Sequence, residues 1–283
     1  MFDPTAPIGV FDSGLGGLTV ASAIAQRLPH EGMIYLGDTA RVPYGTRSPA
    51  TVVRYARNNA AFLADAGIKL LVVACNTVSA QGLGGLADGS GIPVVGVIRP
   101  GARAALDASA GGPIAVLGTQ VTVRSLAYEH AIHELDPGRP VHALACPLFV
   151  PLVEEGWNNH TVTRMVAREY LAGLAGTEVD TIILGCTHYP IIRGVIAEAA
   201  AEVLGREVTI VDSATAVADQ VATLLGEWGR GAPVTAEGRR RFVVTDAPDR
   251  IGAAAAQFWG GGDAPTFEHV DVTDRGVGAT GTG

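Results

Sequence analysis

Two short segments of this chain place a cysteine and polar residues directly after an apolar run. "LLVVACNTVSA" spans residues 70–80 and contains Cys75, and "TIILGCTHYPI" spans residues 181–191 and contains Cys186. A buried strand needs no thiol at its end, so this repeated placement indicates chemistry. A thiol has an ordinary pKa of about 8.5, which a protein can move toward neutrality, so it can act as an acid, a base or a nucleophile.

Three interpretations treat each cysteine separately. A buried cysteine is commonly a small hydrophobe, and we prefer this interpretation for Cys146 in "LACPLFVP", where no polar residue follows. Cys186 and His188 could be metal ligands, but zinc sites use three or four ligands at recognisable spacings, and neither C-x-x-C nor H-x-x-x-H occurs. A single cysteine could be a hydrolase nucleophile with a histidine base, which leaves the second cysteine unexplained.

A fourth interpretation uses both thiols together. One thiolate removes a proton from a carbon acid while the other thiol delivers a proton to the opposite face, which inverts the stereocentre. Most amino-acid racemases instead use a pyridoxal cofactor held on a lysine. The only lysine, Lys69, stands at the start of an apolar strand rather than at its end. The sequence therefore favours a racemisation that uses no cofactor and no metal.

An internal repeat supports a pair of equivalent cysteines. "PIGVFDSGLGGLTV" from Pro7 resembles "PIAVLGTQVTVRS" from Pro113, a shift of 106 residues, and Cys75 corresponds to Cys186 with a shift of 111. The alternative is that all α/β strands look alike. Two halves built on one plan would place both cysteines at equivalent strand ends. Ligands of open α/β sheets bind beyond the carboxyl ends of strands, so we expect both thiols to face a shared cleft.

The remaining pattern predicts an α/β protein with two pseudo-symmetric α/β lobes. Each lobe is expected to hold a mostly parallel sheet flanked by helices, with the active site in the cleft between the lobes. The expected strands are 7–11, 33–37, 69–74, 93–98, 113–119, 141–146, 181–185, 208–212, 241–245 and 267–272. The first expected helix follows a Gly-rich turn and ends near residue 28. The others are 51–67, 122–135, 160–175, 191–204 and 213–228.

Length and composition limit the class of protein. A chain of 283 residues, 48% hydrophobic and 17% charged, is typical of two well-buried domains. The net charge of −8 argues against nucleic acid or an anionic membrane as partner. We find no signal peptide and no apolar run of about 18 residues. Three scattered cysteines do not form a disulfide framework, so we expect a cytoplasmic protein with free thiols.

Four motifs, in order, resemble those of the glutamate racemase family, the cofactor-independent racemases of bacterial wall synthesis. They are "GVFDSGLGGLTV", "DTARVPYGTRS", "ACNTVSA" and "LGCTHYP", with "CPLFVPLVEEG" before the last, and the resemblance runs from about residue 8 to 215. It implies interconversion of L- and D-glutamate, which supplies D-glutamate for peptidoglycan. It also implies a chain that crosses to the second lobe and returns. The expected lobes are 1–97 plus 211–273, and 98–210, followed by a disordered tail at 274–283.

The resemblance assigns catalytic roles to five residues. Cys75 and Cys186 become the two acid/base residues. Asp12 is expected near Cys75, where it assists proton movement and contacts the substrate ammonium, and His188 is expected to play the matching role for Cys186. His188 would project to the same side as Cys186 if the strand continues. Glu154 in "LVEEG" matches the acidic assistant of the family, and the adjacent Glu155 stays an alternative.

The expected substrate contacts are neutral donors beside the two cysteines. Without the resemblance, Asp12 and Ser13 could instead form a cap on the next helix. The segment "VPYGTRS" could likewise be an ordinary turn. "GLGG" at 14–17 does not have the G-x-G-x-x-G spacing of dinucleotide-binding loops. We expect these glycines to let the backbone pass close to substrate. The expected binding residues are Asp12, Ser13, Tyr44 through its hydroxyl, Gly45 through its backbone N–H, Asn76, Thr77, Thr187 and His188.

Two other functions stay open at this point. Aspartate racemases share these lobes, but they typically carry an acidic residue where this chain has His188. A catalytically idle binding or regulatory protein is the second alternative, and the two intact cysteines argue against it. As partners we expect glutamate as a small-molecule substrate, no nucleic acid, no membrane, and a second copy of the chain in a homodimer.

Overall fold

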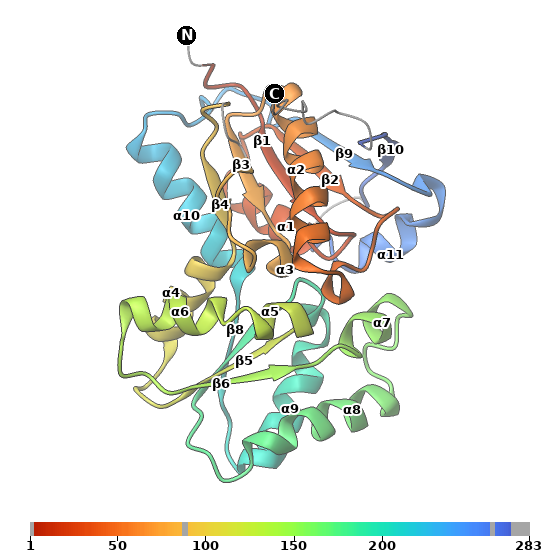
Figure 1. Ribbon diagram of the computed structural model, residues 1–283. Helices are drawn as coiled ribbons and strands as arrows, with labels where there is room; N and C mark the ends of the chain where they lie inside the picture. Colours follow the sequence, from red (N-terminus) through yellow and green to blue (C-terminus); the bar gives the residue numbers. More distant parts are fainter. Residues whose placement is uncertain (1–2, 87–89, 261–263, 273–283) are drawn as a thin grey trace, which may run out of the picture.

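The computed structural model describes residues 3–86, 90–260 and 264–272. Within them the chain forms two sheets, and every strand pairing in both is parallel. Figure 1 shows one lobe around each sheet, with the yellow-green to teal lobe below the red, orange and blue one. The expected tail at 274–283 lies outside the described residues.

The first sheet has the strand order β10–β9–β2–β1–β3–β4. Its strands are β1 Ile8–Asp12, β2 Met33–Gly37, β3 Leu70–Val73, β4 Val94–Gly96, β9 Arg240–Val244 and β10 Phe267–His269. The second sheet has the order β6–β5–β7–β8. Its strands are β5 Ile114–Gly118, β6 Val141–Ala145, β7 Thr181–Gly185 and β8 Thr209–Asp212.

The order β2–β1–β3–β4 in the first sheet is repeated as β6–β5–β7–β8 in the second. In each sheet the first strand of the repeat, β1 or β5, is central and buried along its whole length. This burial on both faces explains why both strands are apolar apart from Asp12 at the end of β1. Cys75 follows β3 and Cys186 follows β7, which are equivalent strands, so the pseudo-symmetry expected from the sequence is confirmed.

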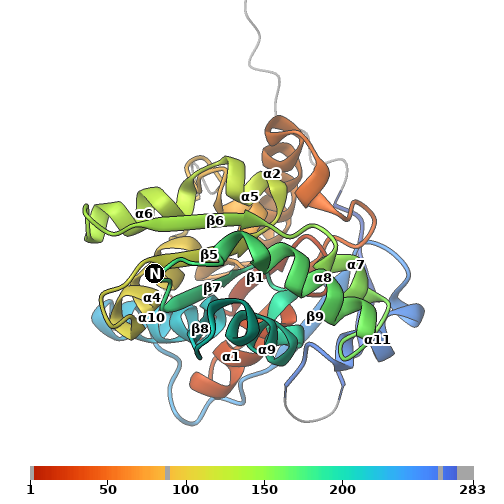
Figure 2. The ribbon, with the colours of Figure 1, turned by 90° about the horizontal axis from the view of Figure 1, so that it is seen from below.

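Helices cover both sheets. The α-helices are α1 Leu18–Arg27, α2 Pro49–Asp65, α3 Asn76–Ser79, α4 Ile98–Ala108, α5 Gln120–Arg124, α6 Ala127–Leu135, α7 Phe149–Glu154, α8 Thr161–Leu171, α9 Arg193–Leu204, α10 Ser213–Glu227 and α11 Gly252–Ala256. The 3-10 helices are η1 Tyr44–Thr46, η2 Ala172–Leu174, η3 Tyr189–Ile192 and η4 Pro248–Arg250. Figures 1 and 2 show α4, α5 and α6 on the face of the second sheet toward the first lobe, with α8 and α9 on the other face. None of the described helices has the length and apolar character that a membrane crossing requires.

The structure differs from the expected elements between strands. Helix α4 was not predicted. Pro100 is tolerated in its first turn, where backbone N–H groups lack partners within the helix. The helix expected at 122–135 is two helices, since Leu126 adopts a left-handed conformation with φ of 56°. The short helices α3 and α7 were also not predicted.

The connections between the lobes run through β4–α4 and β8–α10. We propose lobe boundaries near residues 97 and 210, as the resemblance implied. The second of these falls inside β8, whose Asp212 still pairs with Leu184 of β7. The next helix, α10, packs against α1 of the first lobe.

Gly37 provides a test of the packing at the carboxyl end of the first sheet. A Cβ at this position would lie 2.5 Å from the backbone oxygen of Gly14, which also accepts a hydrogen bond from the Tyr35 hydroxyl. Backbone cannot move aside as a flexible side chain can, so Gly37→Ala should lower the free energy of unfolding by about 1–3 kcal/mol in chemical denaturation.

The matched control is Gly226→Ala, inside α10, where an added Cβ would meet nothing within 4 Å. Helix propensity predicts that this change is neutral or stabilising by up to about 1 kcal/mol. Equal stability of the two variants would contradict the packing described here.

Candidate active site

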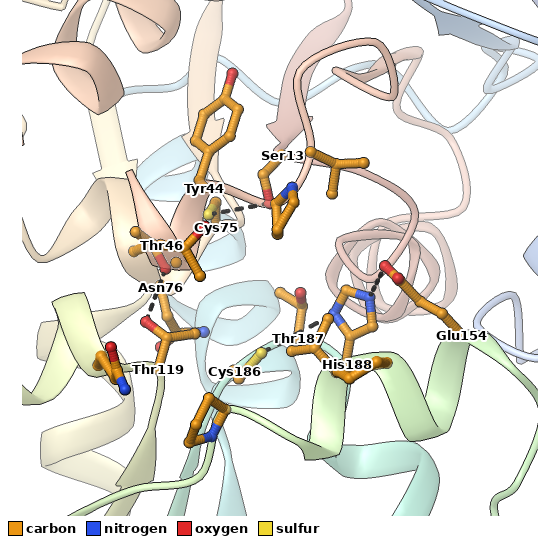
Figure 3. A pocket seen from close by; sticks show the side chains of 18 residues that line it. Ser13, Tyr44, Thr46, Cys75, Asn76, Thr119, Glu154, Cys186, Thr187 and His188 are labelled. Atoms are coloured by element: carbon orange, nitrogen blue, oxygen red, sulfur yellow. Dashed lines mark hydrogen bonds and ion pairs between the residues drawn. The ribbon is translucent and has the colours of Figure 1, made fainter. Parts of the chain in front are cut away.

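A cavity of about 250 Å³ lies between the two lobes and contains both cysteines (Figure 3). Its size is just below the roughly 300–1,000 Å³ of pockets for drug-sized ligands, so it suits a small substrate. The first lobe contributes Ser13, Val42, Pro43, Tyr44, Gly45, Thr46, Cys75, Asn76 and Thr77. The second lobe contributes Thr119, Gln120, Pro147, Val150, Pro151, Glu154, Cys186, Thr187 and His188.

Cys75 lies at the point where the chain leaves β3 and enters α3. It is the N-cap residue of α3, and its extended backbone turns the sulfur into the cavity. The Sγ of Cys75 lies 3.6 Å from the Ser13 hydroxyl. Burial, reinforced by the negative charge of Asp12, raises the pKa of Cys75 to about 12. At neutral pH this cysteine is therefore a protonated thiol.

Cys186 has a different set of neighbours. Its Sγ lies 3.9 Å from His188 Nδ1, and His188 Nε2 lies 3.2 Å from a carboxylate oxygen of Glu154. The strand does not continue as expected, because the chain turns into η3 after Gly185. The turn nevertheless brings the imidazole between the sulfur and the carboxylate, as Figure 3 shows.

His188 is buried and positively charged. Burial acts to lower the pKa of His188, but the contacts with Cys186 and Glu154 outweigh it and raise the pKa to about 10. The imidazolium is therefore present at neutral pH, beside the Cys186 sulfur. Glu154 ends α7 with a half-exposed side chain, whereas the exposed Glu155 is the C-cap residue of that helix. The structure thus selects Glu154 as the acidic partner.

Asp12 lies behind the cavity rather than in it. It is fully buried at the end of β1, and its Oδ2 accepts a hydrogen bond of 3.0 Å from Gly14 N–H. Burial raises the pKa of Asp12, although the His188 charge acts in the opposite direction. Asp12 is not among the residues that line the cavity, and its expected contact with the substrate ammonium stays a prediction. Its electrostatic influence on Cys75 is present.

The "GLGG" segment brings the two lobes into close contact. A Cβ on Gly16 would lie 2.4 Å from Thr187 Oγ1 and 2.6 Å from His188 Nδ1, and one on Gly17 would lie 2.4 Å from Asp12 Cβ. Gly16 is therefore required for packing against the second lobe, and Gly17 for packing against Asp12 of its own lobe.

The hydroxyl of Tyr44 is directed away from the cavity. It bonds the carboxylate of Asp38, and it also accepts a hydrogen bond of 3.2 Å from Asn59 Nδ2. Figure 3 shows the hydroxyl pointing away from both cysteines. The expected contact between this hydroxyl and a substrate carboxylate is therefore wrong, since the polar network below the loop already uses it. Gly45 lines the cavity as expected.

Neutral polar groups line the wall between the cysteines. Asn76 Oδ1 accepts a hydrogen bond of 2.7 Å from the Tyr128 hydroxyl, and Asn76 Nδ2 has no partner among the described residues. Thr77 Oγ1 lies 3.1 Å from Thr119 Oγ1, and Thr187 lines the wall nearby. Thr119 was not predicted, although the internal repeat contains the signal, since a shift of 106 carries residue 13 to residue 119.

The other reactive residues lie elsewhere. Lys69 is buried in an ion pair of 2.6 Å with Glu31 and bonds the carbonyl oxygens of Pro4 and Arg230, so its amine does not reach the cavity. Cys146 is buried with its sulfur 3.6 Å from the Leu144 carbonyl oxygen, in agreement with a packing role. Residues 3–86, 90–260 and 264–272 contain no cluster of three or more His, Cys, Asp or Glu side chains arranged to hold a metal ion.

Comparisons with known proteins find relatives along most of the chain. Residues 12–221 match the family described as Asp/Glu/Hydantoin racemase. A glutamate racemase of Geobacter metallireducens is 49% identical over 258 residues, which are 91% of this chain and 94% of that protein. A glutamate racemase isoform of Bacillus anthracis superposes with a TM-score of 0.87 at 38% identity, covering 95% of this chain and 98% of that one. The glutamate racemase of Francisella tularensis, solved in complex with D-glutamate, also superposes with a TM-score of 0.87. It is 36% identical, and the match covers 96% of this chain and 99% of that one.

The contact between Glu154 and His188 predicts a pH response. The pKa of His188 is raised above its ordinary 6.5 to about 10 by Cys186 and Glu154 together, so these contacts add stability that is complete below pH 6.5 and is lost as pH rises through about 10. Glu154→Gln removes the carboxylate charge and should lower the pKa of His188, measured by NMR titration of the imidazole. Glu155→Gln, on the exposed neighbour, should leave that pKa unchanged. An equal response in the two variants would refute the assignment.

Proposed function

The chain belongs to the Asp/Glu/Hydantoin racemase family, among its glutamate racemases, and on this premise we propose that it interconverts L- and D-glutamate with two cysteines. The observation that carries the proposal is the pair of thiols at the ends of β3 and β7. They lie in one small cavity and come from opposite lobes. A substrate held between them would present one face of its α-carbon to each sulfur.

The proposed reaction moves one proton at each face. From L-glutamate, the Cys186 thiolate takes the α-proton, and the electron pair of the broken C–H bond delocalises into the adjacent carboxylate. The Cys75 thiol then delivers its proton to the other face of the same carbon. The enzyme ends with its proton on Cys186 and its negative charge on Cys75. D-glutamate uses the same steps in reverse, beginning at Cys75.

The unequal surroundings of the two sulfurs support this order. The imidazolium of His188 stabilises a thiolate at Cys186, while burial keeps Cys75 protonated. When Cys75 becomes the thiolate, the Ser13 hydroxyl can donate a hydrogen bond to it across 3.6 Å. Asp12, buried at the end of β1, assists proton movement at this side.

Recognition of glutamate would rest on neutral donors. Glutamate has two carboxylates, and the unpartnered Nδ2 of Asn76 and the hydroxyls of Thr77, Thr119 and Thr187 line the cavity. The backbone N–H of Gly45 completes the proposed set. Several converging donors orient two carboxylates better than a single charge does.

Three wider expectations follow from the kinship with bacterial glutamate racemases and stay part of the proposal. They are supply of D-glutamate for peptidoglycan synthesis, a cytoplasmic location, and a homodimer. A catalytically idle binding protein is disfavoured, because such a protein would need neither thiol in the cavity.

Substrate choice is the first test. The histidine at position 188, where aspartate racemases typically carry an acid, favours glutamate. Racemisation of glutamate followed by circular dichroism should exceed that of aspartate by at least about tenfold, or ~1.4 kcal/mol. Equal rates for the two amino acids would contradict the proposed specificity.

The cysteine variants test the mechanism. Cys75→Ser and Cys186→Ser should each abolish racemisation, because a hydroxyl is far too weak an acid to replace a thiol. Each variant keeps one thiolate, so it should still eliminate a good leaving group from the third carbon of one enantiomer of a glutamate analogue. The two variants should show opposite enantiomer preferences, with Cys186→Ser acting on the D form and Cys75→Ser on the L form.

Cys146→Ser is the matched control. It buries a hydroxyl in an apolar site, so it should lower stability but leave racemisation intact. An identical enantiomer preference in the two cavity variants, or an effect in only one of them, would overturn the two-face mechanism.

A further inference from the structure

Tyr128 packs against two glycines, Gly101 and Gly185, whose lack of side chains leaves room for its ring. Its ring is buried in α6, between α4 and the end of β7. A Cβ on Gly185 would lie 3.1 Å from Tyr128 Cε2, and one on Gly101 would lie 3.3 Å from the phenol oxygen. Gly185 directly precedes Cys186. The ring therefore packs closely against the strand end that carries one of the two thiols.

The Tyr128 hydroxyl reaches from the second lobe to the first. It donates a hydrogen bond of 2.7 Å to Oδ1 of Asn76, the first residue of α3. Burial raises the pKa of Tyr128, so the phenol keeps its proton and stays a donor. Because the phenol donates, the oxygen end of the Asn76 carboxamide is the end that faces Tyr128.

The nitrogen end of the same carboxamide is left without a partner. Asn76 is buried and lines the cavity beside Cys75 (Figure 3), and its Nδ2 makes no hydrogen bond within the described residues. An unsatisfied buried donor costs about 1–3 kcal/mol. A substrate carboxylate oxygen would supply the missing acceptor.

We propose that Tyr128 is a positioning residue for substrate: its hydroxyl holds the carboxamide of Asn76 so that Nδ2, not Oδ1, faces a carboxylate of glutamate. This inference rests on the proposed function. Without the hydroxyl, the carboxamide can rotate and present its oxygen, which repels a carboxylate. The hydrogen bond also crosses between the lobes, so substrate binding depends on their relative placement.

The test is a double-mutant cycle with Tyr128→Phe and Asn76→Ala. Tyr128→Phe should raise KM for both enantiomers about tenfold, or ~1.4 kcal/mol, with kcat changed by less than about threefold, as expected for lost binding. In the Asn76→Ala background, Tyr128→Phe should have no further effect. If Asn76→Ala is too slow to assay, calorimetric Kd values for glutamate replace KM throughout.

The matched control is Tyr170→Phe, which removes a hydroxyl that accepts a hydrogen bond from Leu148 N–H outside this network; its KM should equal that of the wild type. An unchanged KM in Tyr128→Phe, or an equal rise with and without Asn76, would overturn the inference. A wild-type protein that fails to racemise glutamate contradicts the proposed function instead, so the two failures are distinguishable.

Discussion

The buried contact of His188 with Cys186 and Glu154 is the interaction on which the proposed chemistry depends. Two thiols that invert a stereocentre must share one proton, so one sulfur has to be charged while the other is not. Two identical buried thiols would both stay protonated, because burial disfavours the thiolate. The imidazolium breaks this equivalence at one sulfur, and the contacts with Cys186 and Glu154 keep the imidazole charged although it is buried.

The fold maintains this arrangement by close contacts between its two lobes. Gly16 of the first lobe packs directly on Thr187 and His188, and a Cβ on Gly45 would lie 3.0 Å from Thr119 of the second. Side chains at these glycines would separate the lobes at the place where the two sulfurs share a cavity. The repeated strand order supplies equivalent thiol positions, and the loops after the strands make their surroundings different.

The sequence predicted the parts of the site that follow directly from strands. Cys75, Cys186 and the lobes are consequences of apolar runs, their ends and an internal repeat. Tyr44 was misassigned because a sequence does not reveal that the buried carboxylate of Asp38 engages its hydroxyl. Tyr128 and Thr119 were not predicted because their roles depend on contacts across the lobe interface, between residues far apart in the chain. His188 was predicted from the family resemblance, and a turn, not a continuing strand, brings it to Cys186.

The central claim is that each face of the α-carbon is served by its own thiol. Racemisation of L-glutamate in D2O, followed at low conversion by NMR and chiral separation, tests it most directly. A thiol that waits between turnovers exchanges its proton with solvent, so D-glutamate should carry deuterium at the α-carbon from the first turnovers while the remaining L-glutamate keeps its proton. D-glutamate that carries protium at its α-carbon, or equal early deuteration of both enantiomers, would show that one group serves both faces. Either result would contradict the account.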